Sequence, residues 1–394
     1  MQNTKSDQRL ASLDLLRGFD IFYLTVVCFI VGAAHRTWGL PEGLMAQFRH
    51  PSWAGFSIHD LIMPLFLFMS GAAVPLALPK RLSADGHADW PFWRHVLTRV
   101  ALLWFCGLIA QGELFSFDLH RISFVNNTLQ TIACGYAIAA GVILIRNRAL
   151  RLAMPFLLAL VYTVFLHACG DMSPTGNAAV VYEVKFLTLF YGDPSLHPVS
   201  QIANWHYTWW TTIPMFGVLA LAGCEATQIV RGSWSNRAKL GVLLGVAAGL
   251  ALLGLALSTF DPVVKHIFTA SFTAYALACN FLLYALFFLA FDMLKWRRGT
   301  GLLRVFGRHS LAAYMSAETV LRSLYRTASA ILLTGPQKSW PHGLSRFFAD
   351  EKTFEFLREC VLAALLCAFL VWLDRLRTPK QNQQRRSLNE SQQT

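Results

Sequence analysis

The sequence predicts an all-α integral membrane protein, a polytopic bundle of about ten transmembrane helices with the N and C termini both in the cytoplasm. Hydrophobic residues fill 55% of the 394 positions and charged residues only 14%, whereas soluble domains average about 25% charged. Runs of roughly the 20 apolar residues that a membrane helix needs recur between Leu13 and Trp372. These runs are continuously apolar rather than alternating, which favours helices over a membrane β-barrel.

The expected spans follow the apolar runs, and each is near the length that a bilayer requires. They cover residues 13–34, 57–79, 96–112, 127–145, 152–168, 207–230, 240–257, 268–294, 309–333 and 356–374. The first run reaches Ala34 without a small-residue cleavage site, so we expect it to remain as an anchor. We expect a cytoplasmic N-terminus over 1–12, one transmembrane domain over 13–375 and a disordered basic cytoplasmic tail over 376–394.

The net charge of +12 sets the predicted orientation. If the termini are cytoplasmic, the cytoplasmic segments hold 21 lysines and arginines, and the opposite loops hold 8. Basic residues concentrate in the cytoplasmic loops of membrane proteins, so this bias predicts both the orientation and an even number of spans. The same rule accounts for the basic charge without a nucleic-acid partner.

The eight cysteines lie almost entirely inside the apolar runs, and no two are spaced as CxxC. A buried free cysteine behaves as a small hydrophobic residue. We therefore predict neither a disulfide framework nor a metal site.

The segment 49–71 carries the most informative polar residues. His50 and Trp53 lie in a short polar loop on the predicted outer side, and His59 and Asp60 lie at the start of the second span. An ionisable side chain near hydrocarbon is energetically costly and is usually retained for a function. Because histidine exchanges a proton near neutral pH, His50 is the leading candidate for a catalytic base, with an ordinary loop histidine as the alternative.

Asp60 is the candidate partner of His50. A carboxylate there would hold the imidazole in one tautomer and stabilise its cation. A hydrogen bond to a neighbouring helix end is the alternative role for Asp60. Consecutive residues of a helix point about 100° apart, so we do not expect His59 to act together with Asp60.

Two groups near the predicted cytoplasmic face are candidate phosphate-binding sites. Arg17 lies three residues after Asp14 in the first span, where it forms either an internal ion pair or a guanidinium site for phosphate. Arg308, His309 and Ser310 stand where the ninth span begins. The positive end of a helix beside an arginine favours phosphate, and a simple capping serine is the alternative.

Candidate acceptor-binding residues lie on the predicted outer side. Four aromatic residues gather where the sixth span begins and act either as interface anchors or as a platform for sugar rings: Trp205, Tyr207, Trp209 and Trp210. Gln130 falls inside the fourth span and needs a polar partner. Thr212 stands just before Pro214, which frees backbone carbonyls to line a cavity. We predict that the acceptor contacts Trp53, Gln130, Trp209 and Thr212.

Six segments resemble, in this order, blocks of one membrane family: RLASLDLLRGFD, RHPSWAGFSIHDLIMPLFLFMSG, NTLQTIACGYAIA, WWTTIPMFGVLALAG, KHIFTASF and FGRHSLAAYMS. From Arg9 to about Leu373 the chain resembles the transmembrane acetyltransferase family of heparan-α-glucosaminide N-acetyltransferase and its bacterial relatives. The resemblance implies that cytoplasmic acetyl-CoA donates an acetyl group to a glucosamine amine on the far side. It also implies that His50 is the active-site residue and that Asp60 is the family's acid.

The chain departs from the lysosomal member of that family at three points. Cys28 and His309 stand where that enzyme has asparagines, and no large soluble domain precedes the first span, as in the bacterial relatives. These departures leave the identity of the acceptor open.

The preferred hypothesis is a bacterial inner-membrane acyltransferase that uses acetyl-CoA as co-substrate and acetylates an amino sugar or glycan at the outer, periplasmic face. Its partners are the acceptor and the lipid bilayer, and a homodimer is one option for its oligomeric state. The alternative is an inner-membrane amino-sugar transporter, because polar residues within spans also suit a permeation path: Asp14, Asp60, Glu225 and Glu318. The lack of an evident inverted repeat argues against transport. A purely structural subunit fits poorly with the ionisable residues at 50–60.

Overall fold

A computed structural model of the chain describes residues 10–83, 85–112, 114, 122, 124–193, 195, 199, 202–203, 206, 208–321 and 351–391. Within these residues the chain is helical, and its one extended pairing is an antiparallel bridge between Ala54 and Val264. Eight helices of this part are long and apolar enough to cross a membrane: Ala11–Trp38, Ile58–Ala77, Trp90–Gln111, Arg148–Cys169, Trp210–Arg231, Asn236–Leu257, Ala270–Met293 and Glu355–Leu376. The apolar helices indicate a multi-pass membrane protein.

Two of the ten expected spans differ from this set. The expected span 127–145 is a shorter apolar helix, α6 (Thr128–Val142). The expected span 309–333 begins with α14 (Ser310–Met315) and a π-helical turn, Ser316–Leu321, and then leaves the described residues. The count of ten spans and the cytoplasmic termini stay predictions.

Contacts divide the expected domain 13–375 into two compact units. The first unit comprises Met1–Phe48 and Lys295–Thr394, and the second comprises Arg49–Leu294. The segment 49–71, with its candidate catalytic residues, therefore lies in the second unit. Each unit is described separately.

The first unit contains a span with a widened turn in its middle. Helix α1 (Ala11–Phe22) passes through a π-helical turn, Tyr23–Val27, into α2 (Cys28–Trp38). Single π-turns inside α-helices are frequent at functional sites. The short helix α3 (Glu42–Met45) and a 3₁₀ turn, Ala46–Phe48, follow.

Two further helices pack against this span within the first unit. The ring of Phe22 meets that of Phe306, on α13 (Gly301–Arg308), edge to face at 5.3 Å. On α17 (Glu351–Ser391), Phe356 contacts Trp38 at a centroid distance of 4.6 Å. Aromatic pairs of this kind stabilise helix packing.

Helix α17 continues to Ser391, where we expected a disordered tail from residue 376. The tail is rich in glutamine and arginine, which are good helix formers, and Pro379 removes a single helical N–H from it. Extending an existing helix needs no new nucleus, so polar residues can continue a helix that apolar residues began.

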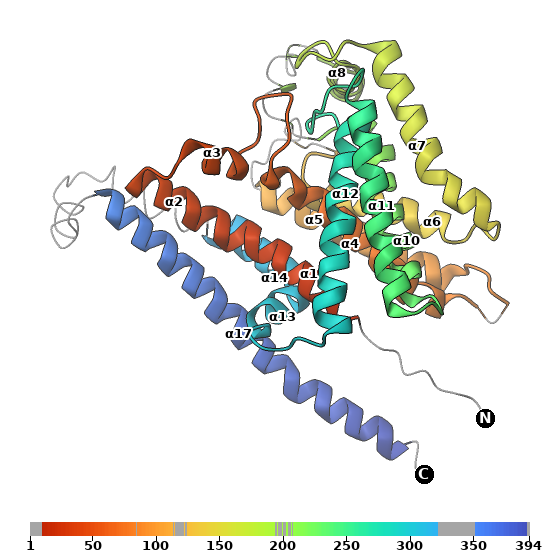
Figure 1. Cartoon of the computed structure of the whole chain (residues 1–394), viewed down its shortest axis with the longest axis vertical. Coiled ribbons are helices and arrows are strands. Elements are labelled where there is room, and N and C mark those ends of the chain that lie inside the picture. The colour runs from red at the N-terminus through yellow and green to blue at the C-terminus, as the bar shows by residue number, and fades with distance from the viewer. Residues whose placement is uncertain are drawn as a thin grey trace. The chain divides into compact units, whose positions relative to one another are not determined.

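The second unit holds the candidate site, and Figure 1 shows its helices α4, α10, α11 and α12 running beside one another. Its helices are α4 (Ile62–Ala77), α5 (Trp90–Gln111), α6, α7 (Arg148–Cys169), α8 (Ala178–Tyr191), α10 (Ile213–Arg231), α11 (Asn236–Leu257) and α12 (Ala270–Phe287). In the apolar stretch of the span Ile58–Ala77, which contains α4, 78% of the residues are buried. In that of α7 only 11% are buried. The span with α4 is therefore an interior element, and α7 is peripheral.

Helices α4 and α10 approach each other closely. A Cβ atom at Gly71 or Gly223 would collide with a backbone carbonyl of the facing helix, so only glycine fits at these two positions. Pro75 lacks an N–H group, which leaves the Gly71 carbonyl without its partner within the helix. The Cys224 thiol of α10 donates to that carbonyl at 3.1 Å, and Thr227 donates to the next carbonyl at 2.8 Å. These contacts fix the position of α4 and of the turn that precedes it.

An ion pair joins α10 to the peripheral helix α7. The Glu225 carboxylate lies 3.8 Å from the Arg151 guanidinium and accepts a hydrogen bond from Gln228 at 3.1 Å. Glu225, named above among the polar residues that suit a permeation path, is therefore paired with an arginine.

Candidate functional site

His50 and Asp60 form the centre of the candidate site. The Nδ1 atom of His50 lies 2.6 Å from Oδ1 of Asp60. The Asp60 side chain is fully buried, and the His50 side chain is 43% exposed. The structure thus brings together the two residues that the sequence predicted as catalytic, with the imidazole on the accessible side of the pair.

The chain places Asp60 through a local motif at the start of a helix. A 3₁₀ turn, Ile58–Leu61, leads into α4, and Ser57 precedes it in an extended conformation. Oδ2 of Asp60 accepts hydrogen bonds from the backbone N–H and the hydroxyl of Ser57, both at 3.0 Å. This capping box is favourable because a carboxylate stabilises the positive end of a helix. Ser57 therefore occupies one carboxylate oxygen, and the other faces His50.

The same contacts assign the tautomer of His50. An ionised carboxylate only accepts hydrogen bonds, so Nδ1 of His50 carries a proton that it donates to Asp60. In the neutral imidazole the lone pair then lies on Nε2, on the opposite side of the ring. A base with its lone pair on Nε2 and a carboxylate behind it is a recurring catalytic arrangement.

Lys265 is a third member that our sequence analysis did not single out. Its Nζ atom lies 3.1 Å from Nε2 and 3.2 Å from Nδ1 of His50, and 3.5 Å from Oδ1 of Asp60. Its side chain is 14% exposed. Burial lowers the pKa of Lys265 to about 8, although the Asp60 carboxylate acts in the opposite direction. The only signal in the sequence was its place in the family-like segment KHIFTASF.

Two further histidines and a tryptophan surround these groups. The ring of His59 lies against that of His50 at a centroid distance of 4.5 Å. We set His59 apart from Asp60 by helical geometry, yet the loop before the helix folds back and brings His50 beside it. The His266 ring stacks on Trp53 at 5.8 Å. Burial, and then the nearby charges of Lys265 and His50, lower the pKa of His266.

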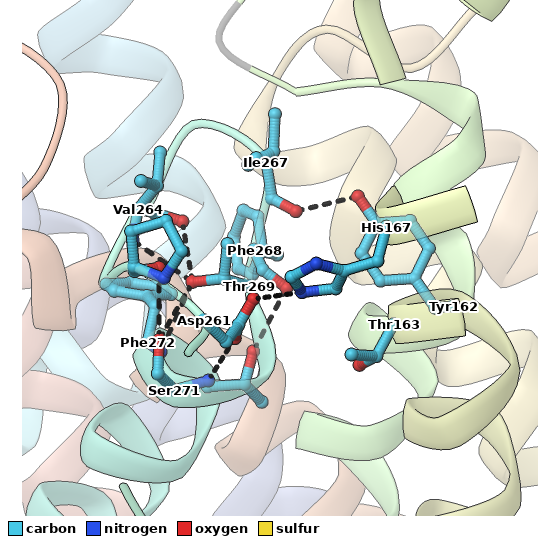
Figure 2. Close-up of polar contacts among 12 residues, drawn as sticks. Tyr162, Thr163, His167, Asp261, Val264, Ile267, Phe268, Thr269, Ser271 and Phe272 are labelled. Atoms are coloured by element: carbon cyan, nitrogen blue, oxygen red, sulfur yellow. Dashed lines mark hydrogen bonds and ion pairs between the residues drawn. The ribbon is translucent and has the colours of Figure 1, made fainter. Parts of the chain in front are cut away.

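Helix α7 anchors the loop that carries Lys265, as Figure 2 shows. The His167 imidazole lies 3.0 Å from one oxygen of Asp261, and the backbone N–H of Ser271 donates to the other at 2.9 Å. The Tyr162 hydroxyl donates to the Ile267 carbonyl at 2.7 Å. The loop is thus held at both ends, with Lys265 between the anchors.

Hydrogen bonds also join this loop to the segment that carries His50 and Asp60. The N–H of Gly55 donates to the Val263 carbonyl at 2.8 Å, beside the bridge between residues 54 and 264. Within the loop itself, the hydroxyl of Thr269, the N-cap of α12, accepts from the N–H of Val264 at 3.0 Å and so steadies the strand-like residue of that bridge. The two segments of the site are therefore connected through their backbones as well as their side chains.

The predicted acceptor residues Trp53 and Trp209 have specific polar contacts. Trp53 donates through Nε1 to the Met172 carbonyl at 2.7 Å. Trp209 is fully buried and donates to the His266 carbonyl at 2.6 Å. Trp209 therefore supports the loop that carries Lys265, and its face is not open as a sugar platform. The aromatic residues 205 and 207 lie outside the described residues.

The other two predicted acceptor residues are buried at helix starts. Gln130 accepts the backbone N–H of Asn126 at 2.8 Å, where α6 begins. The Thr212 hydroxyl donates to the Trp209 carbonyl in the 3₁₀ turn Trp210–Thr212 before α10. Both side chains stabilise local backbone, and no described contact joins either of them to His50.

The predicted donor-binding residues lie in the first unit. Arg17 is half-buried on α1. Arg308 and His309 both contact Asp374 of α17, at 3.3 Å and 3.0 Å. We expected a helix start at 307–310. Helix α14 does begin at Ser310, with His309 between it and the end of α13 at Arg308, and the His309 carbonyl accepts the N–H of Ala313 at 2.8 Å. Ser310 therefore follows a helical turn rather than a loop.

Glu183 is a buried acid that our sequence analysis missed, because the segment 169–206 was expected to be a loop. It lies on α8, and its carboxyl accepts the backbone N–H of Trp210 at 3.0 Å. Burial raises the pKa of Glu183 to about 8, opposed by that hydrogen bond. His206 lies 3.8 Å from its other oxygen.

No family model and no curated protein matches the chain. Among the described residues, no group of three or more histidine, cysteine, aspartate or glutamate side chains is arranged to hold a metal ion.

Proposed function

We propose that the protein is a membrane-embedded acyltransferase of the bacterial inner membrane. It would move an acetyl group from cytoplasmic acetyl-CoA to an amino sugar or glycan at the periplasmic face. One observation carries the proposal: a half-exposed imidazole, His50, is held at 2.6 Å by a fully buried carboxylate, Asp60. The resemblance to the transmembrane acetyltransferases supplies the reaction class, and their active-site histidine and acid correspond to these residues.

In this reaction His50 acts as a general base. Its Nε2 atom takes a proton from the acceptor amine while the amine nitrogen bonds to the acyl carbon. Asp60 stabilises the imidazolium that results. The carbon–sulfur bond then breaks, and His50 returns the proton to the leaving thiolate. A transient acetyl-imidazole on His50 is the alternative route, with the same overall balance of atoms.

The donor would be held near the predicted cytoplasmic face by Arg17 or by residues 308–310. Arginine side chains bind phosphate oxygens through a planar fork of N–H groups. The Arg308 side chain is 38% exposed beside its partner Asp374, so a phosphate would compete with that carboxylate for the guanidinium.

The direct test is transfer of label from radiolabelled acetyl-CoA to glucosamine by the purified protein in detergent. We expect His50→Ala to lower the rate by about 10²–10⁴-fold, the usual contribution of a general base. His87→Ala is the matched control, because His87 is exposed in the loop before α5. A fully active His50→Ala variant would contradict the proposal. Label on the protein in the absence of acceptor would distinguish the acetyl-imidazole route.

One observation favours transport as the second candidate. Asp20 on α1 is 2% exposed, and its Oδ2 atom has no hydrogen-bond partner among the described residues. A buried acid within a membrane helix is typical of proton-coupled transport. Uptake of labelled glucosamine into sealed vesicles without acetyl-CoA, abolished by Asp20→Asn, would favour this candidate over the acyltransferase.

A further inference from the structure

We propose that Lys265 is a further catalytic residue, whose ammonium group binds the oxyanion formed when an amine attacks an acyl thioester. This inference rests on the proposed acyltransferase function and assigns a role that His50 and Asp60 do not fill. Stabilisation of such an oxyanion is often the largest single contribution to acyl-transfer catalysis.

The position of Nζ leaves the base free to act. Nζ is nearly equidistant from the two ring nitrogens of His50, at 3.1 Å and 3.2 Å. In the plane of the ring, that position would collide with the carbon between the two nitrogens. Nζ of Lys265 therefore lies off the ring plane, and the in-plane lone pair of Nε2 stays open to the N–H of a substrate.

The contacts of Asp60 indicate that Lys265 is not needed to satisfy the hydrogen-bonding capacity of this carboxylate. Oδ2 already accepts two hydrogen bonds from Ser57, and Oδ1 is 2.6 Å from His50. Lys265 is 3.5 Å from Oδ1, farther than it is from either nitrogen of His50. An ammonium has three donors, so Lys265 retains capacity to bind a substrate oxygen.

Charge balance supports the same role. At rest, the ammonium of Lys265 balances the carboxylate of Asp60. When the amine attacks, the imidazolium of His50 and the new oxyanion appear together. The net charge of Lys265, Asp60, His50 and the oxyanion then stays at zero only if Lys265 keeps its proton. Among the described residues, the imidazoles of His59 and His266 also face this ammonium.

The loop geometry makes the ammonium a fixed donor. Asp261, Tyr162 and Thr269 hold the loop on either side of Lys265, and Figure 2 shows these bonds. A donor that is already in place requires little reorganisation during the reaction. Lys265 stays protonated through every step: the amine proton passes to His50 and then to the thiolate.

The pH profile gives the test a readout that a structural role would not change. Burial lowers the pKa of Lys265 to about 8, so we expect kcat/KM of the wild type to fall as the pH rises through about 8. Arginine stays protonated over this range. The Lys265→Arg variant should therefore keep part of the activity and lose the alkaline decline.

Removing the charge tests the same role through the rate. We expect Lys265→Met to lower kcat by about 10²–10³-fold, the usual effect of losing one oxyanion donor. Lys185→Met is the matched control, because Lys185 is an exposed lysine of α8 whose ammonium lies over the ring of Tyr182. Thermal unfolding in detergent reports whether each variant folds.

Three outcomes separate the inferences. Near-normal kcat in Lys265→Met overturns the role of Lys265. An unchanged alkaline decline in Lys265→Arg does so as well, even if Lys265→Met fails to fold. Full activity in His50→Ala overturns the proposed function itself, whatever the lysine variants show.

Discussion

Replacing Asp60 by asparagine separates the charge of this side chain from its shape. Ser57 presents two donors to Oδ2, its backbone N–H and its hydroxyl, both at 3.0 Å. These donors require an oxygen, so the amide of an asparagine would turn its oxygen towards Ser57 and its NH₂ group towards His50. An NH₂ group facing Nδ1 forces the imidazole into the opposite tautomer, with the proton on Nε2. The base would then have no lone pair on the substrate side.

The size of the effect follows from this reversal. A histidine base held in the wrong tautomer loses about 10³–10⁴-fold in kcat, which corresponds to roughly 4–5.5 kcal/mol of transition-state stabilisation. The loss of folding stability should be much smaller. The capping hydrogen bonds remain, and the missing charge at the helix start is worth about 0.3–1 kcal/mol. Lys265 loses its carboxylate partner as well, but burial already lowers its pKa to about 8, so it can release its proton rather than stay charged without a counter-ion.

Steady-state acetyl transfer and thermal unfolding in detergent test the two magnitudes together. Asp85→Asn, an exposed loop residue, is the control and should leave both unchanged. An Asp60→Asn variant with a rate within about threefold of wild type would refute the tautomer argument. So would a variant whose lost activity matches an equally large loss of folded protein.

Three other changes test the fold around the site. Gly223→Ala places a Cβ atom against a backbone carbonyl of α4 and should prevent a stable fold. The control Gly241→Ala lies in open space on α11 and should leave the free energy of unfolding unchanged or raise it by up to about 1 kcal/mol, as thermal unfolding can measure. Tyr162→Phe removes the hydrogen bond to the Ile267 carbonyl. It should lower the free energy of unfolding by about 1 kcal/mol and slow acetyl transfer. Unchanged values for both would show that this hydrogen bond is dispensable. Burial raises the pKa of Glu183 from 4.5 to about 8, so between these pH values the folded state holds a proton that the unfolded state releases. The resulting contribution to folding stability is complete below pH 4.5 and is lost as the pH rises to about 8. Glu183→Gln should flatten that part of the stability profile, and an identical profile in wild type and variant would contradict the burial argument.

The pairing of His50 with Asp60 could be predicted from sequence because both residues lie within one loop and the helix turn that follows. The motif Ser57-x-x-Asp60 also carries a local capping signal. Lys265 could not be found this way. It is 215 residues from His50 in the chain, and nothing local distinguishes it from any other loop lysine.

The sequence did not show which of the other predicted side chains are buried. Trp209 and Thr212 were expected to meet the acceptor, but both are fully buried: Trp209 binds the distant His266 carbonyl, and Thr212 binds local backbone. From sequence alone, an aromatic or hydroxyl side chain at a helix start looks the same whether it binds an acceptor or supports the backbone. Glu183 was missed because α8, with 14 residues, is too short to be recognised as a span.

The backbone bridge between residues 54 and 264 has a consequence for synthesis. The ribosome makes the imidazole and its carboxylate early, and the cation and its anchoring loop much later. A chain that stops before residue 261 therefore contains a histidine paired with an acid but no ammonium beside them. Under the proposed function, the oxyanion donor would therefore be absent until Lys265 is added, after about two thirds of the 394 residues.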